Sequence, residues 1–280
     1  MKVATWPFEE EIYPSEETVE ATIGSIKGLD AAQWALLEQE TTGLEALLGD
    51  VAGYSKGERN AAAERAVRER LKGIIRFHQP RALPLAEGTT GTGADALPYA
   101  HGRAYLVKLG VEFDLPAKLK EAQYRYRKAF CRAWLTGEGE ACRPTVLRVY
   151  PDRLIKGGPQ MVKVELSPSL KWAGVEGSLG SISADVQVGV VSPATVGFLG
   201  DDQRAPYWEM TEKNEAILGG FDFWFVVDVP RGCDPAKIRL ALLGEGDLKF
   251  NLGPLQMGPR KQMRQERPEI TLAQMLRPAG

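Results

Sequence analysis

The segment from Leu218 to Cys233 limits what this chain can fold into more than any other part of the sequence. Glycines precede it, Pro-Arg-Gly closes it, and between them two sets of positions alternate with a period of two residues. The wholly apolar set is Phe221, Phe223, Phe225, Val227 and Val229. The alternate set mixes charged and apolar side chains and consists of Asp222, Trp224, Val226 and Asp228. This pattern predicts a β-strand that buries one face.

Other segments of the second half of the chain repeat this pattern. The predicted strands are 105–115, 145–150, 161–166, 175–191, 195–199, 206–210, 217–229, 237–243 and 248–252. The last two are expected to form a hairpin, with its turn at Gly244-Glu245-Gly246-Asp247. Because short strands follow one another after residue 145 without a helical pattern between them, they favour antiparallel sheets over β-α-β units. We therefore predict an antiparallel β-sandwich of immunoglobulin-like architecture.

The first part of the chain has the spacing of helices instead. Segments 16–26, 30–51 and 55–75 carry apolar residues at intervals of three and four. Ser55 with Glu58 matches the capping box that begins many helices, and a similar pair precedes the middle segment. The two longer helices are expected to pair as an antiparallel hairpin, because the connection between them is short. The predicted fold class is α+β: an N-terminal helical hairpin unit followed by the β-sandwich.

Changes in composition divide the chain into four predicted regions. Residues 1–79 are the helical unit, and 80–103, rich in Pro, Gly and Thr, are a linker. Residues 104–258 are the β-sandwich domain. Residues 259–280 are a basic tail, which is expected to end in frayed structure because a short isolated helix is only marginally stable.

The segment 116–136 fits either a helix or a strand. Its aromatic content favours a strand. On a regular strand, Tyr126, Phe130 and Trp134 share one side, and we expect that side to face the core while the arginines face solvent.

Charge and cysteine content argue against several classes of function. The chain has 35 basic and 37 acidic residues and a formal net charge of -2, so we expect no nucleic-acid partner. Without a leader pattern or a long apolar run, a cytoplasmic location and no membrane partner are predicted. Cys131, Cys142 and Cys233 lack metal-site spacing and are predicted to be reduced thiols. No metal and no cofactor are expected.

Catalytic motifs are also scarce. The histidines, His78 and His101, lie outside any protease signature, and the segment Gly88–Gly93 lacks the lysine of a phosphate-binding loop. No catalytic residue is predicted. The enzyme alternative is a hydrolase that uses a cysteine nucleophile or carboxylates in loops. The candidate carboxylates are Asp201, Asp202, Asp222, Asp228 and Asp234.

Large aromatic side chains supply the best candidate binding residues, namely Trp172, Tyr207, Trp208 and Trp224. Such rings are enriched at binding surfaces, although they also fill the cores of two-layered β-proteins. The predicted function is non-enzymatic protein-protein interaction, or scaffolding in a larger soluble assembly, with another protein or further copies of this chain as partner. Binding of a carbohydrate or small ligand by the sandwich is the alternative, which exposed tryptophans would favour.

Overall fold

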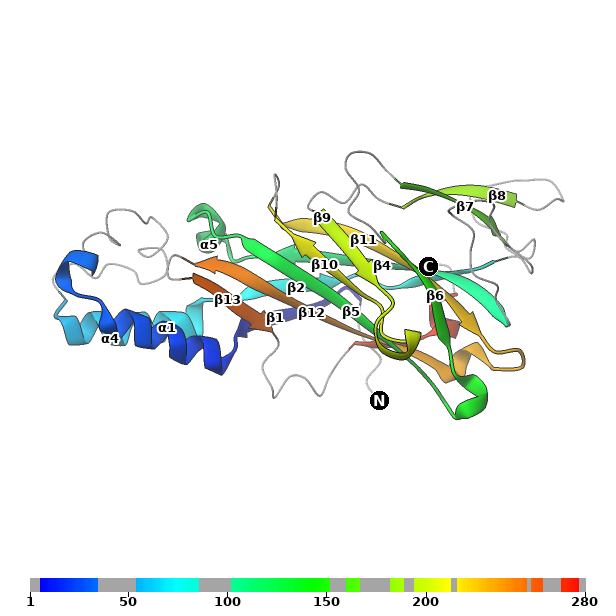
Figure 1. Ribbon diagram of the computed structural model, residues 1–280, viewed down its shortest axis with the longest axis horizontal. Helices are drawn as coiled ribbons and strands as arrows, with labels where there is room; N and C mark the ends of the chain where they lie inside the picture. The colour runs from blue at the N-terminus through cyan, green and yellow to red at the C-terminus, as the bar shows by residue number, and fades with distance from the viewer. Residues whose placement is uncertain are drawn as a thin grey trace.

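The structure is a computed structural model that describes residues 6–34, 54–85, 102–151, 160–166, 182–188, 194–212, 216–250, 253–258 and 268–276. The strands are β1 (Phe8–Pro14), β2 (Gly73–Phe77), β3 (Arg81–Pro84), β4 (Arg103–Asp114), β5 (Tyr126–Gly137), β6 (Thr145–Tyr150), β7 (Gln160–Leu166), β8 (Ile182–Val188), β9 (Ala194–Phe198), β10 (Tyr207–Thr211), β11 (Gly219–Val229), β12 (Ile238–Phe250), β13 (Gly253–Gly258) and β14 (Glu269–Thr271). The helical segments are α1 (Glu16–Gly28), α4 (Lys56–Arg65), the π-helical η1 (Ala66–Arg70), α5 (Ala117–Glu121), η3 (Glu140–Cys142), η4 (Asp201–Gln203), η5 (Pro235–Lys237) and α6 (Leu272–Met275). Figure 1 shows an elongated molecule with α1 and α4 at one end.

One antiparallel sheet organises the described part of the chain. Its hydrogen-bonded order is β6-β11-β4-β2-β1-β13-β12-β5-β10-β9, with β3 beside β4 and β14 beside β12. We call β6, β11, β4 and β2 the first half of the sheet, and β13, β12, β5, β10 and β9 the second half. β1 pairs with β2 on one side and β13 on the other, and so joins the two halves. β7 and β8 form a separate two-stranded sheet.

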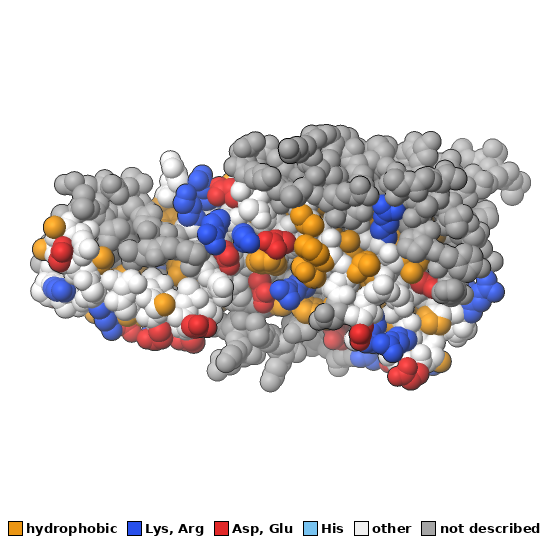
Figure 2. Space-filling view, in the orientation of Figure 1, with side chains coloured by type: hydrophobic (Ala, Val, Ile, Leu, Met, Phe, Trp, Pro, Cys, Tyr) orange, Lys and Arg blue, Asp and Glu red, His pale blue; other side chains and the backbone are white. Residues whose placement is uncertain are grey.

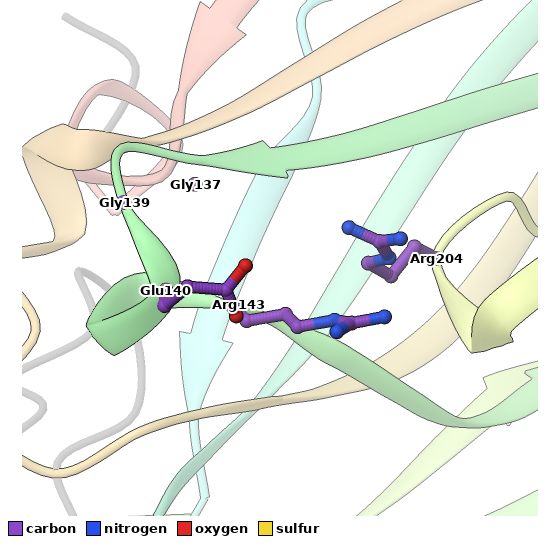
Figure 3. A pocket seen from close by; sticks show the side chains of 5 residues that line it. All are labelled: Gly137, Gly139, Glu140, Arg143 and Arg204. Atoms are coloured by element: carbon purple, nitrogen blue, oxygen red, sulfur yellow. The ribbon is translucent and has the colours of Figure 1, made fainter.

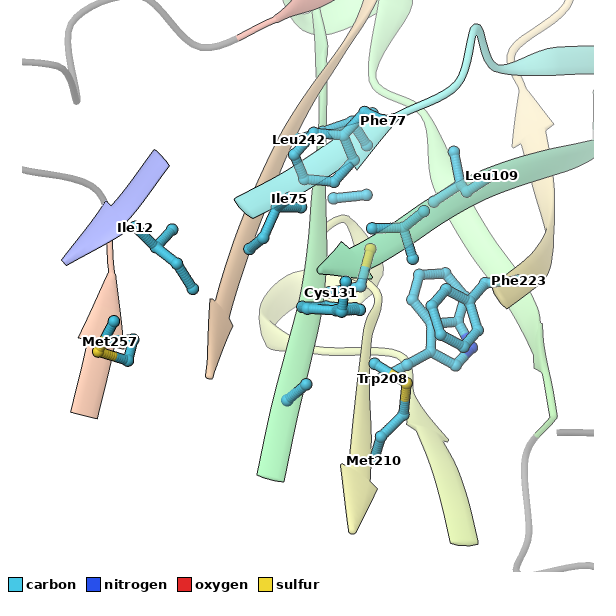
Figure 4. Packing of buried hydrophobic residues seen from close by; sticks show 14 of the residues in the cluster. Ile12, Ile75, Phe77, Leu109, Cys131, Trp208, Met210, Phe223, Leu242 and Met257 are labelled. Atoms are coloured by element: carbon cyan, nitrogen blue, oxygen red, sulfur yellow. The ribbon is translucent and has the colours of Figure 1, made fainter. Parts of the chain in front are cut away.

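The hydrophobic core lies between the two halves, which face each other (Figure 4). The first half contributes Ile75, Phe77, Val107, Leu109, Val111, Phe113, Phe223, Phe225 and Val227. The second half contributes Ala129, Cys131, Ala133, Leu135, Trp208, Met210, Leu240, Leu242 and Leu255. The apolar set that opened the sequence argument is confirmed as core, with only its first ring, Phe221, partly buried.

The two edges of the sheet, β6 and β9, come together through a buried ring. Trp208 on β10 donates its indole N–H to the carbonyl oxygen of Tyr150 at the end of β6, over 3.0 Å. Gly197 on β9 makes room for this contact, because a Cβ atom there would lie 2.5 Å from the oxygen of Pro151. The curled sheet is therefore nearly closed and barrel-like.

The helices pack against one another beside this sheet. The Ser15 hydroxyl caps α1 by accepting a hydrogen bond from Thr18 N, and Ser55 with Glu58 forms the predicted capping box of α4. Arg68 then ties η1 back to α1 by an ion pair with Glu16 at 3.0 Å. The helix predicted at 16–26 is thus present. The helix predicted at 30–51 lies, beyond residue 34, outside the described residues.

The predicted fold class, a helical hairpin unit followed by an immunoglobulin-like sandwich, is wrong. The end of the helix predicted at 55–75 is strand β2, and Phe8–Pro14 forms β1. Both strands belong to the same sheet as the later strands. The apolar residues of β2 fit a helical face by their spacing. In the structure, however, Ile75 and Phe77 alternate with the partly buried Ile74 and Arg76 and pack against Gly244. Pairing with distant strands overrides this local pattern.

The predicted hairpin with its turn at Gly244-Glu245-Gly246-Asp247 is wrong, because strand β12 occupies this segment. It runs through these residues as one strand and pairs with β5 along most of its length. A Cβ atom at residue 244 would lie 2.5 Å from Ile75 Cδ1 on the opposite half of the sheet. This glycine therefore serves close approach of the two layers and not a turn.

β5 is a strand, as the aromatic content favoured, but its faces differ from the prediction. Lys128 pairs with Asp247, and Tyr126 pairs with Leu248, so Arg127 is an extra residue in the ladder. Such a β-bulge shifts the alternation of every residue after it. The core side past the bulge is therefore small and apolar, and Phe130 turns outward.

The end of the described chain is packed and not frayed. β14 pairs with β12, and α6 follows it with a capping box between Thr271 and Gln274. Ile270, Leu272 and Met275 are buried in the core. Burial of these side chains supplies the stability that a short helix lacks in isolation.

A disulfide joins Cys142 to Cys233, whose Cα atoms are 5.2 Å apart. It corrects the prediction of three reduced thiols. One cysteine follows β5 in the second half of the sheet, and the other follows β11 in the first half. Since 91 residues separate them, their spacing in the sequence gave no sign of the pairing.

Candidate functional site

The outer surface of the second half of the sheet carries an exposed group of large side chains. We call it the aromatic face and define it by Val196, Phe198, Phe130, Arg132, Tyr207 and Glu209. Their neighbours along each strand, such as Cys131 and Trp208, are buried in the core. Because side chains alternate along a strand, the residues of the aromatic face point away from the core.

A stacked pair of rings forms one corner of this face. Phe198 of β9 and Tyr207 of β10 are direct partners in the strand register. Their ring centroids are 4.7 Å apart, with an interplanar angle of 15°. Phe198 is 40% exposed, which is unusual for a side chain of this size. The pair thus presents a flat apolar surface to solvent.

Charged side chains surround the rings. The guanidinium of Arg132 lies over Tyr207, 5.5 Å from the ring centroid. Lys128 pairs with Glu209 at 2.8 Å, and Arg132 approaches Glu245 at 4.0 Å. Figure 2 shows hydrophobic side chains gathered in the middle of this face, with Lys, Arg, Asp and Glu around them. An apolar centre with a polar rim is the usual anatomy of a protein interface.

A hollow of about 310 Å³ adjoins the aromatic face. It is lined by Ser15, Lys128, Phe130, Glu245, Gly246, Asp247, Gln256, Met257 and Gly258. Phe130 belongs both to the hollow and to the aromatic face, so the two are continuous. The wall at Gly258 is loosely packed, because a Cβ atom there would come no closer than 3.9 Å to Glu245.

Asp247 gives the hollow an unusual carboxyl group. Burial raises its pKa above the ordinary value of 3.8, and Glu209 adds to this effect. Arg127 and Lys128 oppose the shift but do not cancel it. The carboxyl of Asp247 is therefore protonated more readily than an ordinary aspartate, and it can donate a hydrogen bond when protonated.

The structure separates the predicted binding residues. Tyr207 lies on the aromatic face. Trp208, its neighbour in sequence, is fully buried between the two halves of the sheet and stacks on Phe223 at 5.0 Å. Trp224 is partly buried on the outer side of the first half, with the Lys108 ammonium 5.4 Å from its ring centroid. Trp172 lies outside the described residues.

The cysteines offer little to the hydrolase alternative. Cys131 is fully buried, and burial raises the pKa of its thiol to about 12, so the thiolate needed for attack is suppressed. Cys142 and Cys233 are held in their disulfide. His101 and Asp201 lie where side chains are not described, and His78 is exposed at the end of β2.

The carboxylates predicted for loops do not gather into one site. Asp222 is on β11 and pairs with Lys108, while Asp202 belongs to η4 and Asp234 caps η5. Asp228 accepts a hydrogen bond from the backbone of Gly102. In the described ranges, no group of three or more His, Cys, Asp or Glu side chains could hold a metal ion.

Of the aromatic face, the predicted binding residues contained only Tyr207, and its other large residues Phe130, Arg132 and Phe198 were missed. Phe130 was assigned to the core side because of the bulge at Arg127, which no alternation pattern shows. Arg132 faces solvent, as expected of the arginines, but was not among the predicted binding residues. Phe198 lies on the edge strand β9, on the side of the strand that faces away from the core. The strand prediction at 195–199 contained no such signal, because Val196 and Phe198 share one side and their apolar side chains favour the core.

Comparison with known proteins gives no family. No protein-family model matches this sequence, and no curated protein matches it. A solved structure described as a pore forming protein is similar to this chain with a TM-score of 0.33 and 5% sequence identity, over 73% of this chain and 92% of that chain. A score this low carries no argument about function. Within the part of the chain that the structure describes, no helix is long and apolar enough to cross a membrane.

Proposed function

We propose that this protein is a non-enzymatic interaction or scaffolding protein and that the aromatic face is the surface through which it binds a protein. The exposed Phe198 ring, stacked on Tyr207, is the observation that carries this proposal. Exposed aromatic side chains beside an arginine are the residue types that contribute most to protein interfaces.

The charges on and beside this face favour a second copy of the chain as the partner. Three cations and three anions surround the rings: Arg127, Lys128, Arg132, Glu209, Glu245 and Asp247. A face with balanced charge of both signs can meet an identical face without net repulsion. In a two-fold dimer the same patch is used by both subunits, so such a face is self-complementary.

Sedimentation velocity of the intact chain tests this proposal. We expect the sedimentation coefficient to rise with concentration between about 1 µM and about 100 µM, the range of weak dimers. The double variant Phe198→Ser, Tyr207→Ser should remain monomeric over this range.

Tyr54→Ser supplies the matched control. Tyr54 is 43% exposed, close to the value for Phe198, but it precedes α4 and does not belong to the aromatic face. This variant should associate like the unchanged chain. A chain that stays monomeric at the highest concentration would show that a second copy is not the partner. A Tyr54→Ser variant that loses association equally would show that association does not depend on the aromatic face.

A carbohydrate or small polar ligand is the second candidate, and the hollow beside Phe130 favours it. Hydrogen-bonding side chains converge there next to an aromatic ring: Lys128, Glu245, Asp247 and Gln256. Pockets for small ligands combine such groups with an apolar wall. Screening the intact chain and a Phe130→Ala variant against a panel of immobilised glycans tests this candidate. The intact chain should bind a glycan that the Phe130→Ala variant does not bind. Absence of binding to the intact chain excludes the candidate.

The cytoplasmic location remains a prediction from the sequence. The disulfide between Cys142 and Cys233 argues instead for an oxidising compartment, because such bonds are rare where thiols are kept reduced. Mass spectrometry of the protein from its native source, alkylated after denaturation without a reductant, decides between the two. One modified cysteine is expected for the bridged form and three for the reduced form.

A further inference from the structure

A second cavity lies at the end of β5, away from the aromatic face. Its volume is about 410 Å³, and among the described residues Gly137, Gly139, Glu140, Arg143 and Arg204 line it. Figure 3 shows the charged side chains reaching into one space, Glu140 and Arg143 from the segment after β5 and Arg204 from the loop before β10. The volume falls within the range of about 300 to 1,000 Å³ that small-molecule sites have.

The two arginines share a single carboxylate. Arg204 Nη2 lies 2.8 Å from Asp202 Oδ2, and Arg143 Nη2 lies 3.7 Å from the same oxygen. A guanidinium has five N–H donors, so one carboxylate oxygen leaves most of the donors of this pair unused. The Arg204 Nε atom is buried and has no hydrogen-bond partner. The pair therefore retains both charge and donors for an anionic ligand.

Unusual backbone geometry fixes Arg204 in this position. Asp202 and Gln203 both have left-handed backbone angles, with φ of 52° and 53°, and Gly200 has a φ of 71°. Left-handed angles at residues other than glycine cost free energy and persist where the surrounding structure requires them. Here they turn the chain so that Asp202 and Arg204 meet Arg143.

The opposite wall is fixed by a glycine and by the disulfide. A Cβ atom at Gly137 would lie 1.6 Å from the carbonyl oxygen of Cys142, so η3 can fold back on the end of β5 only with glycine there. Cys142 is bonded to Cys233, which holds the backbone next to Arg143. The backbone that carries both arginines is thus fixed before any ligand arrives, and such preorganisation lowers the cost of binding.

Glu140 determines what kind of anion fits. It lines the same cavity and makes no ion pair among the described residues. A carboxylate facing the space would repel a simple anion, but it accepts hydrogen bonds from a hydroxyl or ammonium group. The cavity thus offers a cationic side for an oxyanion and an anionic side for a donor.

We propose that this cavity binds a small carboxylic acid that carries a hydrogen-bond donor on the adjacent carbon, as amino acids and hydroxy acids do. The carboxylate of the ligand bonds to Arg143 and Arg204, a charge-assisted geometry that guanidinium groups favour. The donor on the adjacent carbon bonds to Glu140. This site does not depend on the aromatic face.

Calorimetric titration of the intact, oxidised chain with isosteric acids tests the proposal. L-Alanine, L-lactate and propionate differ only in carrying an ammonium, a hydroxyl or no donor on the carbon next to the carboxylate. L-Alanine and L-lactate should bind at least about tenfold more tightly than propionate, the loss expected for one charge-assisted hydrogen bond. Inorganic phosphate, which lacks this arrangement, should bind less tightly than L-alanine.

Three variants assign the contacts. Arg143→Gln and Arg204→Gln should each weaken the binding of L-alanine by at least about tenfold. Glu140→Gln should remove the difference in affinity between L-alanine and propionate. Arg125→Gln is the matched control, because Arg125 also pairs with a carboxylate, Glu212 at 2.6 Å, but precedes β5 at its other end. Each variant is tested for folding by its melting temperature; if Arg204→Gln does not fold, Arg143→Gln carries the test.

Two results would overturn the proposal. One is the absence of saturable binding of L-alanine and L-lactate to the intact chain. The other is a lack of specificity: Arg125→Gln weakens the binding of L-alanine as much as Arg143→Gln does, or propionate binds as tightly as L-alanine.

Discussion

Two pairs of stacked rings lie on opposite sides of the same strand, β10. Inside, Trp208 stacks on Phe223 with centroids 5.0 Å apart and an interplanar angle of 13°. Outside, Tyr207 stacks on Phe198 at 4.7 Å and 15°. The ring geometry is nearly the same, yet the inner pair is fully buried, whereas in the outer pair Phe198 is exposed and Tyr207 is partly buried.

The difference lies in what each pair joins. Trp208 and Phe223 belong to opposite halves of the sheet, so their contact holds the two layers together. Tyr207 and Phe198 belong to adjacent strands that backbone hydrogen bonds already join. We therefore expect the inner pair to determine stability and the outer pair to be available for binding. Each of the following variants tests that division.

The largest effect is expected from Trp208→Ala. It removes a fully buried indole, its stacking on Phe223 and its hydrogen bond to Tyr150, and leaves a cavity between the layers. Replacement of a large core aromatic residue by alanine costs about 3 to 5 kcal/mol of unfolding free energy. Chemical denaturation of the intact chain measures this loss. A loss below about 1 kcal/mol would mean that the inner pair does not hold the layers together.

Gly197→Ala should cost less, about 1 to 3 kcal/mol, the usual cost of overpacking. Its new Cβ atom would lie 2.5 Å from the oxygen of Pro151 and 2.8 Å from Trp208 Nε1. The matched control is Gly220→Ala on β11, where nothing lies within 4 Å of the added atom. Equal denaturation midpoints for the two variants would show that the edges of the sheet are not tightly packed at Trp208.

Asp247→Asn tests the outer side by its dependence on pH. Burial raises the pKa of Asp247 in the folded chain, so ionisation is harder there than in the unfolded chain. The protonated carboxyl of Asp247 therefore stabilises the fold at pH values below its pKa in the unfolded chain. This stability is lost as the pH rises through its pKa in the folded chain. The variant should therefore be more stable than the unchanged chain at pH 7, and this advantage should vanish in acid.

Asp114→Asn gives the comparison of opposite sign. Burial also disfavours the charged form of Asp114, but the backbone N–H of Leu115, Lys120 and Arg76 outweigh it and lower the pKa. Stability from Asp114 is then present above the unfolded pKa and lost as pH falls through the folded pKa. This variant should be less stable at pH 7. Equal curves of unfolding free energy against pH for both variants would contradict these assignments.

The smallest effect on stability is expected from Phe198→Ala. The ring is exposed and packs on one neighbour in an already paired ladder, so the unfolding free energy should change by no more than about 0.5 kcal/mol. Self-association should nevertheless weaken. A loss of stability as large as that of Trp208→Ala would abolish the distinction between the two pairs.

Alternation along single strands was the part of the fold that the sequence could predict. The face from Phe223 to Val229 is core because four apolar residues at period two fit one side of a buried strand and no helix. The same rule failed at Ile75, where the apolar residues have a spacing that fits both structures. Only the register of β2 with β1 and β4 decides between them, and that register is a property of the whole sheet.

The candidate site was predictable only at Tyr207. Phe130 faces outward because Arg127 is an extra residue opposite β12, and one inserted residue reverses every later side chain. Gly244 was assigned to a turn because a glycine in the sequence does not show whether it bends the chain or leaves room for a side chain. Here it leaves room for Ile75 of the opposite layer. Local sequence carries neither piece of information.

The disulfide closes residues 142–233, about a third of the chain, into a covalent ring. Any single cut of the backbone between Cys142 and Cys233 opens this ring without releasing a fragment. A protease that cleaves there leaves one molecule of unchanged mass, apart from the added water, until a reductant separates the pieces. Electrophoresis with and without reductant would therefore distinguish cuts inside the ring from cuts in the segments on either side.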